Sequence, residues 1–158
     1  MRSFMRGVHS LLLQLHGLGM RPCQDHDDPI VHIRRELNGM PDWLASHPQQ
    51  KISLSVHPLR MVLMGNIIAQ FDGSAKSWAS GAAWTWHASP DQYTAIDQCE
   101  LLATGSWSLL PGTNAVDAEL CAMFACLAAL KSLLQGRLLD HIAETAFQHP
   151  LTVHRKST

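Results

Sequence analysis

The stretch that decides the fold runs from residue 114 to residue 134 and reads NAVDAELCAMFACLAALKSLL. Its leucines and other large apolar residues recur at helical spacing, and alanine or cysteine fills most of the remaining positions. Thr113 or Asn114 can cap its start, and Asp117 falls in the first turn, where the helix dipole favours negative charge. A helix that is apolar all round is normally buried on two sides. We therefore expect one side of this helix to lie on a sheet and the other to need a second cover.

Three strands are predicted immediately before this helix. Residues 61–71 form a bulky apolar run, which is typical of a strand buried on both faces. Residues 81–88 contain Trp84 and Trp86 at period-two spacing, which indicates a second strand with both rings packed in the core. A third strand is expected within residues 101–110, before a Pro-Gly turn. The short connections allow an antiparallel meander.

Two carboxylates occupy positions at the edge of this predicted core. Asp72 follows the first strand directly and precedes Gly73 at the start of a turn expected over residues 73–80, and Glu119 lies near the start of the helix, on the flank of its leucine stripe. Buried carboxylates cost free energy unless something pairs with them. Hard divalent cations take oxygen ligands, so the two side chains are candidates for one metal site. Each also has a purely structural explanation: aspartate before glycine is common in turns, and glutamate near a helix N-terminus is favoured by the dipole.

The order of these elements resembles the type 1 ribonuclease H domain, in particular the domains embedded in reverse-transcriptase retroelements. The likeness is carried by Asp72-Gly73-Ser74 after the first strand, and by the pattern N-x-x-x-A-E-L-x-A over residues 114–122. It covers roughly residues 62–140 and about the first half of the family's domain. The resemblance implies an α/β, ribonuclease H-like mixed sheet, in which three antiparallel strands are followed by a helix and a short fourth strand. The fold would be incomplete at its C-terminal end.

The resemblance also implies a site and a reaction. Asp72 matches the aspartate of the family's first strand, and Glu119 matches the glutamate of its first helix. Asp140 stands at about the right distance for the third carboxylate, although His141 replaces the serine that usually follows it. The family's fourth carboxylate belongs to a final helix for which this sequence shows no counterpart. Together these residues would hold two Mg²⁺ or Mn²⁺ ions and cleave the RNA strand of an RNA–DNA hybrid.

The first part of the chain is less informative. Residues 1–60 are expected to be a poorly defined N-terminal extension, and residues 61–158 the partial ribonuclease H-like domain. One short amphipathic helix is predicted within residues 30–44, broken by Gly39 and Pro41.

Composition restricts the classes of partner and compartment. The formal net charge of −1 gives no bulk electrostatic attraction for a phosphate backbone. The four cysteines form no C-x-x-C pair, which indicates a reduced, intracellular chain with structural thiols. No apolar run is long enough to span a membrane. Trp78 could stack on a base and Lys76 could touch a phosphate, although a lone surface lysine is usually only solvated.

Three functional hypotheses remain open at this point. The chain could be an active, ribonuclease H-type hydrolase whose fold is completed by dimerisation or by a partner. It could be a catalytically inactive, truncated remnant that binds nucleic acid weakly. It could also be a protein-interaction module in which the alanine-rich helix face packs on another protein. Convergence of Asp72, Glu119 and Asp140 on a common point would favour the first hypothesis.

Overall fold

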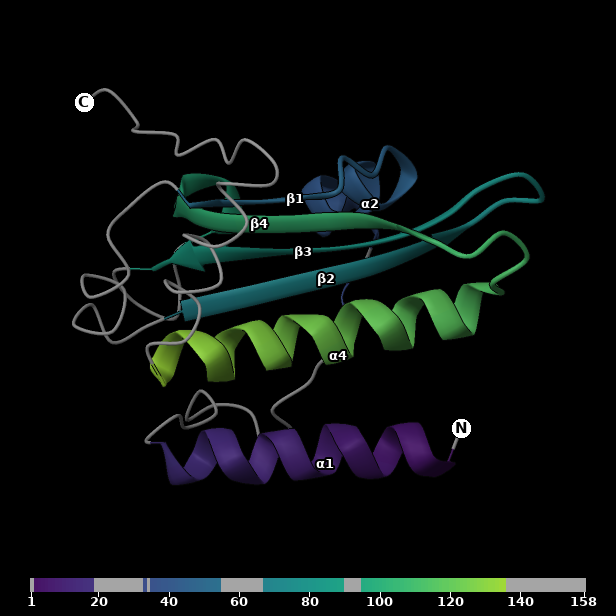
Figure 1. Ribbon diagram of the computed structural model, residues 1–158. Coiled ribbons are helices and arrows are strands. Elements are labelled where there is room, and N and C mark those ends of the chain that lie inside the picture. The colour runs from purple at the N-terminus through teal and green to yellow at the C-terminus, as the bar shows by residue number, and fades with distance from the viewer. Residues whose placement is uncertain (1, 19–32, 34, 55–66, 90–94, 136–158) are drawn as a thin grey trace, which may run out of the picture.

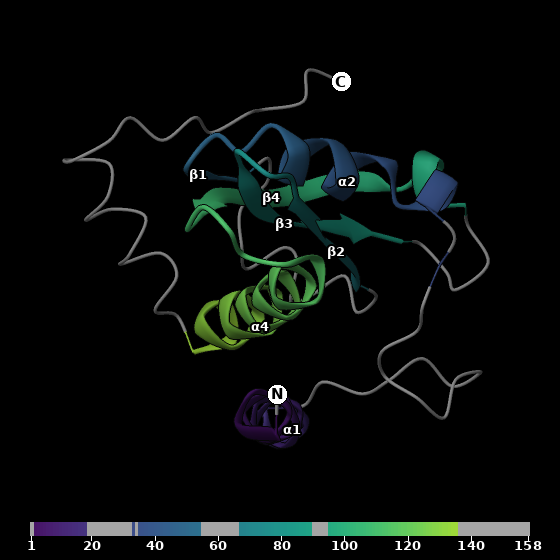
Figure 2. The ribbon, with the colours of Figure 1, turned by 90° about the vertical axis from the view of Figure 1, so that its right-hand side faces the viewer.

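The computed structural model describes residues 2–18, 33, 35–54, 67–89 and 95–135. Within these residues the chain is a mixed α/β structure in which helices cover both faces of an antiparallel sheet (Figures 1 and 2). The strands are β1 (Lys51–Leu54), β2 (Ile67–Ala75), β3 (Ser80–Ala88) and β4 (Glu100–Leu109). The helices are α1 (Arg2–Gly17), α2 (Gly39–Ser46) and α4 (Ala115–Leu134), with 3-10 turns at Arg35–Leu37 and Ile96–Gln98.

The sheet has the strand order β1-β4-β3-β2, and all three described pairings are antiparallel. The predicted meander of three strands leading into a long helix is therefore confirmed. Every residue of β3 is buried, because β3 lies inside the sheet with helices on both sides. Trp84 and Trp86 are 1% and 0% exposed, and their rings stack with centroids 4.4 Å apart. Their predicted role in the core is confirmed. The expected parallel fourth strand falls in residues outside the described ranges.

Strand β2 differs from the prediction at its C-terminal end. The sequence suggested a strand ending at Phe71 and a turn over residues 73–80, but β2 continues to Ala75. Asp72 therefore lies inside the strand, opposite Ala83, and not at its end. The small residues Ala82 and Ala83 on β3 let the pairing run on past Gly73. The predicted start of the strand, residues 61–66, lies outside the described residues.

Helix α4 is covered on two sides, as its all-round apolar sequence predicts. Asn114 is its N-cap and accepts a hydrogen bond from the Asp117 backbone N–H at 2.8 Å, as expected for a capping residue. On one side the fully buried Ala118 lies against Gly73 of β2. On the other side Phe124 approaches Gly7 of α1. Helix α1 lies beyond α4, on the side away from the sheet (Figure 2). The second cover therefore comes from the chain's own first helix.

The N-terminal region contributes more structure than its sequence indicated. Helix α1 presents Val8, Leu11 and Leu15 at three- and four-residue spacing, and all three belong to the main core. The predicted helix break at Gly39 and Pro41 is wrong, because α2 begins at Gly39 and contains Pro41. Proline is tolerated in the first turn of a helix, where its missing N–H would have no intrahelical partner.

Strand β1 pairs with β4 and extends the sheet on the side away from β2. None of the helices within the described ranges is long and apolar enough to cross a membrane.

Candidate active site

The candidate site is built on a close contact between strand β2 and the start of helix α4. Gly73 has no side chain, and a Cβ placed there would overlap the backbone of Ala118 and Glu119 and would lie 2.6 Å from the Ala118 carbonyl oxygen. Only glycine lets the helix approach the strand this closely. The contact fixes the first turns of α4, and with them Glu119, directly beside the segment that carries Asp72.

Asp72 and Gly73 point to opposite faces of the sheet, because successive side chains alternate along a strand. Gly73 faces α4. Asp72 pairs with Ala83, which shares its face with Gly81, and Gly81 contacts Ala45 of α2. Asp72 therefore lies on the α2 side. In the described part of the chain β2 is an edge strand of the sheet, and α4, which carries Glu119, lies on its other face.

Asp72 is half-buried, and its surroundings disfavour its negative charge. Burial raises the pKa of its carboxyl group, against the opposing effect of the Gly73 backbone N–H, which donates to Asp72 Oδ1 at 2.8 Å. The negative charges of Asp42 and Glu119 raise the pKa of Asp72 further. Two carboxylates that are distant from Asp72 in sequence thus disfavour its negative charge.

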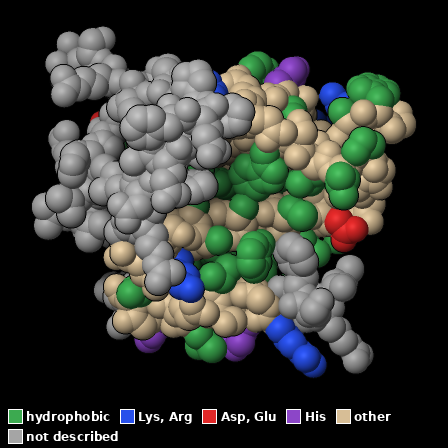
Figure 3. Space-filling view, viewed as in Figure 1, with side chains coloured by type: hydrophobic (Ala, Val, Ile, Leu, Met, Phe, Trp, Pro, Cys, Tyr) green, Lys and Arg blue, Asp and Glu red, His purple; other side chains and the backbone are tan. Residues whose placement is uncertain are grey.

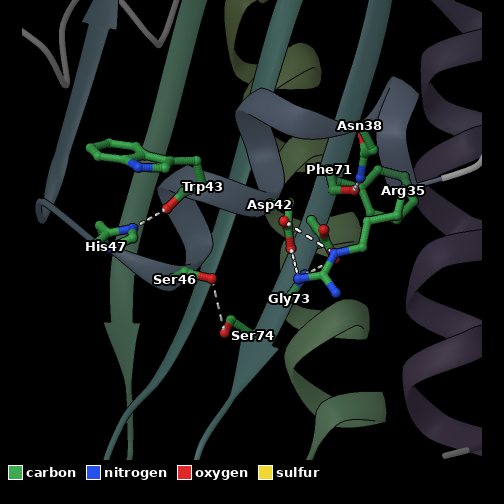
Figure 4. Close-up of polar contacts among 10 residues, drawn as sticks. Arg35, Asn38, Asp42, Trp43, Ser46, His47, Phe71, Gly73 and Ser74 are labelled. Atoms are coloured by element: carbon green, nitrogen blue, oxygen red, sulfur yellow. Dashed lines mark hydrogen bonds and ion pairs between the residues drawn. The ribbon is translucent and has the colours of Figure 1, made fainter.

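Asp42 reaches this place on helix α2, which is held against β2 by several hydrogen bonds (Figure 4). Asn38 Nδ2 donates to the Phe71 carbonyl at 3.0 Å. Ser46 Oγ donates to Ser74 Oγ at 3.4 Å. Gln70, the residue before Phe71, donates from its side-chain amide to the Leu37 carbonyl at 2.9 Å. These bonds run along β2 on both sides of Asp72.

Arg35 forms an ion pair with one of these carboxylates, that of Asp42. Its guanidinium bonds both carboxylate oxygens of Asp42 at 3.3 Å (Figure 4). The hydrogen bonds to Asp42 raise the pKa of Arg35, and the charge of Asp72 adds to that effect. The Arg35 side chain is 79% exposed, so water screens this ion pair strongly. Arg35 therefore offsets only part of the negative charge around Asp72.

Glu119 and Asp117 stand in the first turns of α4 but have different surroundings. Glu119 is exposed, and its charge acts on Asp72. Asp117 is also exposed, and its Oδ2 accepts a hydrogen bond from Asn114 Nδ2 at 2.9 Å. The interpretation of Asp117 as part of the helix cap is confirmed.

Asp140, the proposed third carboxylate, lies outside the described residues. Within the described ranges, no three histidine, cysteine, aspartate or glutamate side chains are grouped so that they could hold a metal ion.

Nothing in the sequence around Asp42 indicates that this residue lies near Asp72. It lies 30 positions before Asp72 in a segment predicted to be broken helix, and it takes part in no motif. The one usable signal was Asn38 before an acidic first turn, which is typical of a helix start. Even a correct helix prediction would not have shown that α2 packs on β2.

Comparison of the chain with protein families, with curated proteins and with solved structures finds no match. The function must therefore be argued from the geometry and chemistry of the residues themselves.

Proposed function

We propose that the protein is a metal-dependent nuclease of the ribonuclease H type, which hydrolyses the RNA strand of RNA–DNA hybrids. The observation that carries the proposal is the contact of Gly73 with the Ala118–Glu119 backbone. The strand that carries Asp72 and the helix that carries Glu119 are in contact, and this contact supports the arrangement that the resemblance implies. The meander before the helix has the order and direction that the resemblance implies.

The donor chemistry of the site suits a hard divalent cation such as Mg²⁺ or Mn²⁺. Asp72, Glu119 and Asp42 offer carboxylate oxygens only, and their mutual repulsion would be relieved by positive charge. In this proposal Asp72 and Glu119 are the first ligands, and Asp140 completes the set from outside the described residues. When bound, the metal would polarise the scissile phosphate and supply a water nucleophile.

The protein's own part in the reaction is to position charge. Half-burial of Asp72 keeps its carboxylate away from bulk water, which strengthens its interaction with a cation. The Gly73 N–H donates to Asp72 Oδ1 and holds that oxygen in place. The Gly73 contact holds the backbone of α4 at a set distance, so that the glutamate stays within reach of the edge of β2.

A catalytically inactive relative that still binds nucleic acid is the second candidate. It is favoured by the incomplete ligand set within the described residues and by the engagement of Asp42 with Arg35. The two candidates share a binding surface and differ only in whether a cation completes the site.

Cleavage of an end-labelled RNA–DNA hybrid in Mg²⁺ tests the proposal. The wild type should cut the RNA strand, and Asp72→Asn and Glu119→Gln should lower the rate by at least about a hundredfold, because a lost metal ligand removes charge stabilisation. Asp117→Asn is the matched control, since Asp117 lies two residues before Glu119 and is exposed. It should cleave at nearly the wild-type rate.

Two further measurements separate the candidates. Mg²⁺ should raise the melting temperature of the wild type and leave Asp72→Asn unchanged, because a ligand that binds only the folded state stabilises it. If wild type and Asp72→Asn cut equally, the assignment of the site is wrong. If neither cuts and Mg²⁺ has no effect on melting while the hybrid is bound, the inactive relative is the correct description.

A further inference from the structure

The tip of the β2–β3 hairpin carries a tryptophan that takes no part in the core. Trp78 is 77% exposed, whereas Trp84 on the following strand is 1% exposed. Ser77 and Trp78 form the two-residue turn between Lys76 and Ala79, whose backbones bond to each other at 2.7 and 3.3 Å. Such turns usually contain glycine, asparagine or aspartate. A large aromatic ring in this place contributes nothing visible to folding, so its surface is free for a contact outside the chain.

The hairpin tip is part of a larger apolar end of the molecule. Leu110, in the turn before α4, is 81% exposed. Its neighbour Leu109 pairs with Ser80 at the base of the hairpin, and Ser80 Oγ donates to the Thr113 carbonyl at 3.0 Å. The hairpin base and the turn before α4 are therefore tied together. Figure 3 shows hydrophobic side chains gathered at this end of the molecule, on the right of the view.

The hairpin tip is close to the candidate active site along the same strand. Ala75, at the end of β2, lies three positions after Asp72, which spans about 10 Å at 3.3 Å per residue. The turn carries Trp78 a few ångströms further. Stacked nucleotides rise about 3.4 Å per step, so Trp78 lies about three to five steps from Asp72. A strand of nucleic acid held at Asp72 could reach the ring.

Charge at the tip selects between two kinds of partner. Lys76 is exposed at the base of the turn and can face a phosphate. Aromatic rings beside basic side chains are the combination by which proteins hold single-stranded nucleic acid, since every base has a face that can stack. An apolar protein surface would pack on Trp78 and Leu110 but would offer Lys76 no negatively charged partner.

We propose that the β2–β3 hairpin is a nucleic-acid contact, in which an unpaired base stacks on Trp78 and Lys76 faces a neighbouring phosphate. The choice of nucleic acid as partner rests on the proposed function. The base must be unpaired, because bases inside a duplex are already stacked on both sides. The natural ligand of the hairpin is therefore a single-stranded extension next to a hybrid.

Fluorescence anisotropy of a labelled hybrid with an extension of about ten unpaired nucleotides tests this proposal. The titrations use the full chain in EDTA, so that binding is measured without cleavage. Trp78→Ala should weaken binding about tenfold, and Trp78→Phe should retain most of the affinity because it keeps a stacking ring. A blunt hybrid should be bound equally by all three proteins.

Trp43→Ala is the matched control. Trp43 is 53% exposed on α2 and stacks on His47 with ring centroids 4.6 Å apart, so its ring is already occupied. Its removal should leave binding of the extended hybrid unchanged. Sedimentation velocity of the same variants reports on protein contacts made through the tip.

The outcomes are distinguishable from those of the cleavage assay. Equal binding by wild type and Trp78→Ala would overturn the inference, as would an equal loss in Trp43→Ala. Loss of self-association in Trp78→Ala without loss of nucleic acid would assign the tip to a protein partner and overturn it too. Trp78-dependent binding without any cleavage in Mg²⁺ would support the hairpin contact and refute only the proposed hydrolysis.

Discussion

Replacement of Gly73 by alanine tests the contact that joins the strand of Asp72 to the helix of Glu119. The added methyl group would lie 2.6 Å from the Ala118 carbonyl oxygen and would overlap the adjacent backbone. Ordinary contact begins at 3.4 Å, so this carbonyl must retreat by about 0.8 Å. The obstacle is main chain of a 20-residue helix, which cannot step aside as a flexible side chain could.

The cost of this displacement can be estimated from overpacked cores. Forcing one methyl group into a well-packed interior costs about 1–3 kcal/mol, and the rigid main chain places Gly73→Ala near the upper end, at about 3 kcal/mol. For a chain of this size each kcal/mol lowers the melting temperature by about 2–4 °C, so a loss of roughly 6–12 °C is expected. Circular dichroism melts and urea titrations measure both quantities.

Gly39→Ala is the control for this experiment. A Cβ at Gly39 meets nothing within 4 Å, so the variant should melt at or slightly above the wild-type temperature. If Gly73→Ala also melted within about 1 °C of the wild type, α4 could not lie against β2 at this point. Asp72 and Glu119 would then have no structural reason to share a site.

Three further predictions concern charge, thiol reactivity and the N-terminal helix. Asp72→Asn should stabilise the metal-free fold at pH 7, because it removes a carboxylate whose pKa is raised by burial and by Asp42 and Glu119. The difference in unfolding free energy should shrink as the pH falls through that pKa, where wild-type Asp72 becomes neutral. Urea titrations at pH 4 to 8 measure this difference, and it would stay constant if the pKa of Asp72 were not raised. Burial raises the pKa of the Cys126 thiol to about 12, against a smaller lowering effect of Trp86. Iodoacetamide at about pH 8 should therefore label Cys126 only after unfolding. Peptide mass spectrometry that found labelled Cys126 in the native protein would contradict this. Leu15→Ala should lower the free energy of unfolding in urea by about 2–5 kcal/mol, because Leu15 is buried in the main core. Leu13→Ala, on the exposed side of the same helix, should lower it little. Equal effects would mean that α1 does not pack on the core as described.

The elements that the sequence predicts well are those with strong periodic patterns. The alternation of Trp84 and Trp86 marked β3, and the capped apolar run marked α4. The all-round apolar character of α4 also indicated that a second cover was needed. It did not indicate which segment supplies that cover, because the packing of α1 on α4 joins parts of the chain about 100 positions apart or more.

The candidate site could be predicted only where a local motif carried it. Asp72 and Glu119 stand in short patterns that are similar to a known family, whereas Asp42 stands in none. Its place beside Asp72 depends on the packing of α2 across β2. Packing between segments that are distant in the chain cannot be predicted from the short stretch of sequence around either one. The length of β2 was misjudged for a related reason: small residues at 72–75 are typical of a turn, but β3 offers them equally small partners.

The packing of α1 on α4 has a consequence for how the protein is made. Leu15 leaves the ribosome about 110 residues before Met123, and synthesis proceeds at about 5–20 residues per second. The apolar side of α1 is therefore without its packing partner, α4, for about 5–20 s after α1 is synthesised. During that interval a chaperone that shields short hydrophobic helices would protect the nascent chain from aggregation.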